Sequence, residues 1–97
     1  MRPFPPTQAF LDAAQRIVWF KEPATALSNP VELMAYAMKH STPRDMDLLL
    51  RHIGHEGLIE ALDNAPPGII DPRSWAYWNA KAGRYPAPPR PTRTLAR

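Results

Sequence analysis

Two histidines, His52 and His55, and the neighbouring Glu56 come nearest, by type and spacing, to a site for chemistry. Imidazole and carboxylate groups three residues apart can hold a zinc ion when further ligands complete the site. Gly54 separates the two histidines at a predicted helix end, and spacing places no third ligand near them. Histidines at a helix end more commonly interact with the helix dipole or face solvent. We therefore predict neither a metal site nor a cofactor.

Carboxylates and hydroxyls elsewhere form no recognisable catalytic arrangement. Asp45, Asp47 and Asp63 lack a spacing suited to paired acid–base work, and Ser41 and Ser74 lack the sequence context of a nucleophile. The four glycines are isolated from one another, which excludes a Gly-rich phosphate loop. With no cysteine, disulfides and thiolate zinc sites are excluded as well. We expect a binding protein and not an enzyme.

Charge and length narrow the classes of protein to which the chain can belong. Ninety-seven residues allow one domain. Residues 84–97 carry four arginines and no acid, so residues 1–83 hold the other eight Lys/Arg against nine Asp/Glu, a net charge of −1. The sequence shows no signal-peptide stretch and no apolar run near the roughly 20 residues that span a bilayer. We expect a cytoplasmic protein without a membrane segment.

Proline marks the helix starts that would position these side chains. Asn29-Pro30, Thr42-Pro43 and Asp71-Pro72 each place a capping residue before proline at the first helical position, where proline loses no hydrogen bond. Apolar residues at helical spacing follow each start. No segment alternates with period two for long enough to predict a strand.

The pattern predicts an all-α fold, a compact irregular bundle of about five short helices with extended Pro/Arg-rich termini. The predicted helices cover residues 7–20, 30–40, 43–53, 55–65 and 72–82, with a connector at 21–28 broken by Pro23. Residues 1–6 form an extended N-terminal segment, 7–83 the helical domain and 84–97 a tail that favours solvated polyproline II. Neither end is expected to stabilise the domain much.

The predicted helices 43–53 and 55–65 resemble a helix-turn-helix in outline. The second of them, however, carries Glu56, Glu60 and Asp63 and no Lys or Arg, and its carboxylates would oppose approach to phosphates. Contact with nucleic acid is therefore expected only through the basic tail, with little sequence specificity.

The main indication of function comes from large apolar residues that do not lie on the apolar, core-facing side of their predicted helices. Trp19, Leu48 and Tyr77 each project away from the apolar face of their own helix. A core wrapped around two sides of a central helix would also account for any one of them. Together with the tail they have the composition of interface anchors. The predicted partner-binding residues are Trp19, Leu48, Tyr77, Arg84, Tyr85, Arg90 and Arg93.

Residues 49–89, LLRHIGHEGLIEALDNAPPGIIDPRSWAYWNAKAGRYPAPP, also carry a family resemblance. They resemble small helical bacterial antitoxins that are encoded beside nucleotidyltransferase-type (AbiEii-like) toxins. The shared pattern is an acidic helix, a Pro-containing turn, Pro-Arg-Ser and an aromatic-x-x-Trp helix. The matching residues here are Glu60, Ala61, Leu62, Pro72, Arg73, Ser74, Trp75, Trp78 and Gly83.

The resemblance implies a protein partner, a nucleotidyltransferase-like toxin that the chain binds and neutralises. The off-stripe residues would then dock on the toxin, and the tail arginines would lie along an acidic groove. Two alternatives stay open from the residues alone. One is a nucleic-acid-binding accessory protein that uses its basic tail, and the other is a homo-oligomeric structural protein in which the aromatics pair across a two-fold axis.

Overall fold

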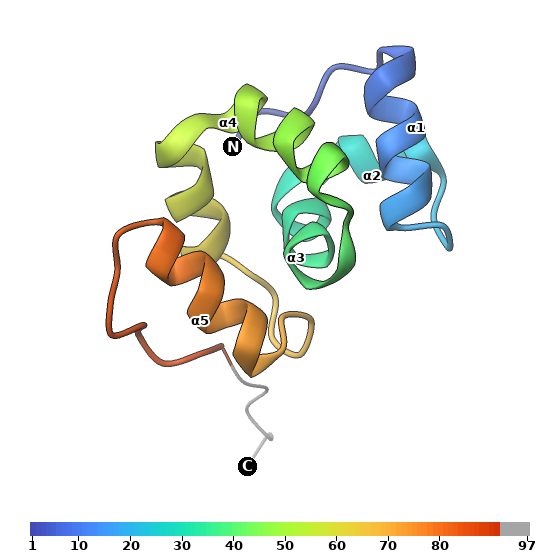
Figure 1. Ribbon diagram of the computed structural model, residues 1–97. Helices are drawn as coiled ribbons and strands as arrows, with labels where there is room; N and C mark the ends of the chain where they lie inside the picture. Colours follow the sequence, from blue (N-terminus) through green and yellow to red (C-terminus); the bar gives the residue numbers. More distant parts are fainter. Residues whose placement is uncertain (92–97) are drawn as a thin grey trace.

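Five helices follow one another in the computed structural model, which describes residues 1–91 (Figure 1). Over those residues the chain contains no strand, and none of the helices is long and apolar enough to cross a membrane. The predicted all-α architecture, a small irregular bundle of five helices, is confirmed. The helices are α1 (Gln8–Ile17), α2 (Pro23–Leu27), α3 (Pro30–His40), α4 (Pro43–Asp63) and α5 (Pro72–Lys81).

The proline-marked helix starts are confirmed, with one difference in the capping. Thr42 Oγ1 accepts the backbone N–H of Asp45 at 3.2 Å, and Asp71 Oδ2 accepts that of Ser74 at the same distance. Hydrogen bonds from the Ser74 hydroxyl and backbone N–H lower the pKa of Asp71. Asn29 instead turns its amide back to donate to the Thr25 carbonyl, so it precedes α3 without a side-chain cap. Proline alone therefore marks the start of α3.

The region between α1 and α3 differs from the prediction. The chain leaves helical geometry at Val18, whose side chain is only 1% exposed, so α1 ends at Ile17 and not at Phe20. The expected connector contains a helix of its own, α2, with Pro23 at its first position and Glu22 as its cap. Pro23 does not break this segment, because a proline at the first turn starts a helix as readily as it ends one.

A kink joins two of the predicted helices into one element. They follow each other directly in α4, where Gly54 between them has φ 70° and ψ −175°, a conformation that is essentially restricted to glycine. The predicted helices 43–53 and 55–65 are the two halves of α4, and the second half ends at Asp63.

The core gathers around α3, which lies in the middle of the molecule and contacts each of the other helices (Figure 1). A helix surrounded in this way must be apolar on more than one side. Its buried residues accordingly include Leu33, Met34, Ala35, Ala37 and Met38.

The N-terminal segment belongs to this core, against expectation. Phe4 is 2% exposed, and its backbone N–H donates to Leu27 O at 3.0 Å. Its ring lies 5.5 Å from that of Phe10 and 5.2 Å from that of His52. Residues 1–6 are extended, as predicted, but Phe4 fixes them to α1, α2 and α4.

Candidate interaction surfaces

Four aromatic side chains form a partly exposed surface beside the end of α1. In this aromatic cluster, Trp19 lies edge-on to Phe20 at 5.4 Å, Phe20 to Tyr36 at 5.3 Å, and Tyr36 lies 6.3 Å from His40. Trp19 is 76% exposed and Phe20 48%. Aromatic rings prefer such edge-to-face arrangements, which hold them in place even where one side is open to water.

The early end of α1 creates this surface. Because Val18 turns inward, Lys21 N–H closes a turn onto Val18 O at 2.9 Å, and the two residues between them point outward. Lys21 then pairs with Glu32 on α3, which raises the pKa of the lysine. This pair fastens the turn to α3 next to Tyr36. The cluster is therefore a fixed feature of the fold and not the tip of a loose loop.

A second surface lies between α3, α4 and α5. A groove of about 310 Å³ is lined by apolar residues that include Met38, Met46 and Trp78. Tyr77, 52% exposed, stands at its edge, with the ammonium of Lys81 5.7 Å from its ring centre. The groove can accept an apolar side chain of a partner.

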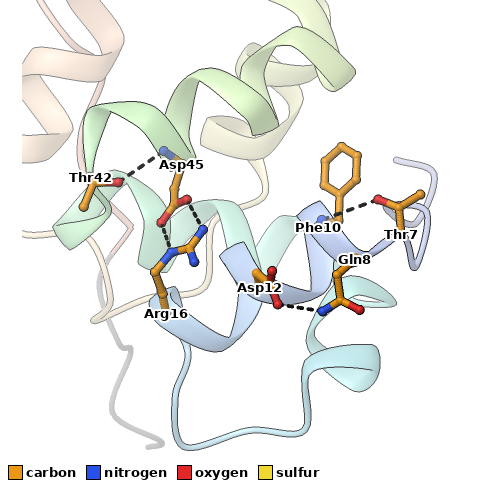
Figure 2. Close-up of polar contacts among 7 residues, drawn as sticks. All are labelled: Thr7, Gln8, Phe10, Asp12, Arg16, Thr42 and Asp45. Carbon is orange, nitrogen blue, oxygen red and sulfur yellow. Dashed lines mark hydrogen bonds and ion pairs between the residues drawn. The ribbon is translucent and has the colours of Figure 1, made fainter.

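Leu48 lines a third and more polar cleft, of about 830 Å³, between α1 and α4. Figure 2 shows the ion pair that bridges the two helices there, with Arg16 Nε and Nη2 donating to Asp45 at 2.9 and 2.7 Å. These bonds hold the pKa of Asp45 below its ordinary value, and burial opposes them. Three arginines and three aspartates line the cleft, so it selects neither anions nor cations. Leu48 itself is half-buried.

The predicted tail residues are largely engaged within the chain. We call residues 84–91 the strap. Arg84 donates to Asn79 Oδ1 at 3.0 Å and to Asp63 Oδ1 at 2.6 Å, and Arg90 donates to Ile70 O at 2.9 Å. Tyr85 alone among the predicted strap residues is fully available, at 81% exposure. Arg93 lies outside the described residues.

The predicted binding residues therefore do not converge on one site. Trp19 belongs to the aromatic cluster, while Leu48 and Tyr77 line two adjoining clefts that share Thr42 and Asp47. The prediction of a solvated arginine arm is wrong for Arg84 and Arg90. Sequence reasoning missed Phe20, because it extends α1 through that residue. It also missed Tyr36, which lies off the apolar stripe that Leu33, Met34, Ala37 and Met38 form at helical spacing and so carries the same signal as Trp19.

The histidines of α4 separate at the kink. His52 packs against Phe4 and Phe10, while His55 follows Gly54 and is exposed. Within residues 1–91 no three His, Asp or Glu side chains gather as a metal site would require.

Comparison of the chain with protein-family models, curated proteins and solved structures found no match.

Proposed function

We propose that this chain is a non-catalytic protein-binding module that docks through the aromatic cluster, and that its partner is a nucleotidyltransferase-type toxin which it neutralises. The observation that carries the proposal is the exposure of Trp19 (76%) next to Phe20 (48%) in one packed pair. Tryptophan is enriched among the residues that carry most of the binding energy of protein interfaces, and phenylalanine is enriched at interface centres.

The size of the rings supports a docking role. Covering one large aromatic side chain contributes on the order of 4 kcal/mol before the costs of association. Because Phe20, Tyr36 and the Lys21–Glu32 pair already hold the cluster in place, little side-chain entropy is lost on binding. Trp19 and Phe20 would form the apolar centre of the interface, with the charged pair at its rim.

The toxin is proposed as the partner on the resemblance of residues 49–89 to antitoxins. Arg84 and Arg90 make intramolecular bonds, so the proposal does not assign them to an acidic groove of the toxin. The same bonds disfavour a nucleic-acid partner held by these two arginines.

The test is co-expression with the protein encoded by the adjacent gene, which the proposal requires to be a nucleotidyltransferase-type enzyme. Wild-type chain should restore growth of cells that express this enzyme and should form a stable complex with it. The double variant Trp19→Ala/Phe20→Ala should bind about 100-fold more weakly by titration calorimetry, since two anchors of at least ~1.4 kcal/mol each are lost.

Tyr85, which the sequence predicts as a partner contact, lies on the strap and is not part of the interface proposed at the aromatic cluster. Tyr85→Ala is therefore the matched control, because it removes an aromatic ring as exposed as Trp19. It should bind as the wild type does. Full affinity in the Trp19/Phe20 variant would contradict the assignment of the surface, and continued toxicity in the presence of wild-type chain would contradict the antitoxin role. Binding that weakens log-linearly with salt would favour nucleic acid instead, and a dimer lost in the double variant would favour self-association.

A further inference from the structure

The strap lies against the domain in a way that resembles a bound peptide. After α5 it turns back and runs beside that helix toward its N-terminal end (Figure 1). There the indole N–H of Trp75 donates to Pro88 O at 2.7 Å, and Arg90 donates to Ile70 O at 2.9 Å. Ala87 packs on the core. Trp75 and Ile70 are 6% and 3% exposed.

The chemistry of these contacts is that of proline-rich recognition. The carbonyls of a polyproline II segment are free acceptors because this conformation makes no internal hydrogen bonds, and a tryptophan indole is a suitable donor beside an apolar wall. A polyproline segment is already extended, so it loses little entropy when it binds. Pro86, Pro88, Pro89 and Pro91 give the strap this character.

The two ends of the strap are held differently. Arg84 is fixed by its backbone N–H to Asn79 O and by its side chain to Asn79 and Asp63. Residues 86–91 are held more lightly, by one hydrogen bond from Trp75, one from Arg90 and the packing of Ala87 on the core. The outer part can therefore lift from Trp75 while Arg84 stays in place.

We propose that the surface formed by Trp75 and Ile70 is a binding site for an extended proline-rich peptide of a partner protein, and that residues 86–91 occupy it as an internal competitor. The contacts define the motif, a proline whose carbonyl meets Trp75 and an arginine two residues later. The surface lies at the other end of the molecule from the α1–α2 turn that carries the aromatic cluster (Figure 1), and the inference does not rest on the antitoxin proposal.

The experiment uses the full chain and a blocked synthetic peptide with the sequence of residues 84–91. In the variant Pro88→Gly/Pro89→Gly/Arg90→Gly, the internal competitor is weakened without shortening the chain. The peptide should shift the indole N–H resonance of Trp75 in this variant and leave that of Trp19 unchanged. The wild type should bind the peptide at least tenfold more weakly, because its own strap competes at an effective concentration in the millimolar range.

A second variant, Arg90→Ala, removes only the contact with Ile70. Its affinity for the peptide should lie between those of the wild type and the triple variant, so the test stays valid if the triple variant unfolds. A peptide whose prolines are replaced by alanine should bind at least fivefold more weakly. Equal affinity of the peptide for all chains, or no shift at millimolar peptide, would overturn the proposal. If the wild type instead forms a dimer at rising concentration by exchanging straps, the site binds a second copy of this chain and not a partner protein. That result would overturn the proposal.

Discussion

Asp45 shows how one side chain links two helices that are distant in the sequence. Its side chain is 3% exposed, while the side chain of Arg16 that holds it is 58% exposed. The cost of desolvating the carboxylate is offset by two bonds from Arg16 and by the hydroxyl of Thr42 at the α4 cap. Because Arg16 stays hydrated, the pair stabilises the contact between α1 and α4 at low cost.

We predict that Asp45→Asn lowers the free energy of unfolding by about 2 kcal/mol, since charged hydrogen bonds to a buried group are lost. Urea denaturation at neutral pH measures the change. Asp47→Asn is the matched control two residues away, because the Asp47 and Arg51 side chains of its ion pair are 60% and 80% exposed. That variant should change stability by less than about 0.5 kcal/mol. Equal losses in the two variants would contradict the role given to Asp45.

The Asp45 carboxylate should also make the free energy of unfolding depend on pH. Its pKa in the folded chain lies below the ordinary value of 3.8 because Arg16 binds the charged form. The stabilisation is therefore complete above about pH 4 and is lost as pH falls through the lowered pKa. Urea denaturation of wild type and Asp45→Asn from about pH 6 to about pH 2.5 should show the difference between them shrinking below about pH 4. A constant difference across this range would contradict the prediction.

At the scale of elements, Gly54 determines the course of α4. Its φ of 70° and ψ of −175° change the direction of the helix between its two halves. An added Cβ at this position meets no atom within 4 Å, so only the backbone conformation opposes a side chain.

We predict that Gly54→Ala lowers the free energy of unfolding by about 1–3 kcal/mol, the strain of a non-glycine residue in this region. His55→Ala at the next, exposed position should change it by less than about 0.5 kcal/mol. Thermal denaturation of both variants checks this. A neutral Gly54→Ala would mean that α4 straightens without penalty.

The starts of most helices could be predicted from the sequence, whereas one helix end and one buried segment could not. Proline after a capping residue locates the starts of α3, α4 and α5, because that signal is local. Periodicity alone misplaces the end of α1, since that end depends on the burial of Val18 by other elements. The burial of Phe4 escapes prediction for the same reason, because an extended segment carries no periodic pattern that shows which face is covered.

At the scale of the whole molecule, the three tryptophans report on three different regions. Trp78 donates its indole N–H to Met38 O on α3 at 3.1 Å, and Trp75 donates to the strap. Trp19 stands in the exposed cluster. The bonds of Trp78 and Trp75 join residues that are 40 and 13 positions apart in the sequence. No local sequence pattern could therefore predict the surroundings of these two rings.

We predict that the indole N–H of Trp19 exchanges with solvent deuterium at the rate of an unprotected group. Those of Trp75 and Trp78 should exchange at least tenfold more slowly, because their donors are bonded and shielded. Two-dimensional NMR after transfer to deuterated buffer measures all three in one sample. Trp75→Phe and Trp78→Phe assign the signals. Fast exchange at Trp75 in the wild type would show that the strap is mostly open.

The closure of Trp75 by Pro88 also has a consequence for biosynthesis. The acceptor lies thirteen positions after the donor, so a nascent chain completes α5 before it can cover the indole. A chain that stops before Ala87 loses the acceptor of the Trp75 indole and the packing of Ala87 on the core, which uncovers apolar surface. Because chaperones and proteases act on such exposed groups, prematurely terminated copies should be degraded faster than complete ones.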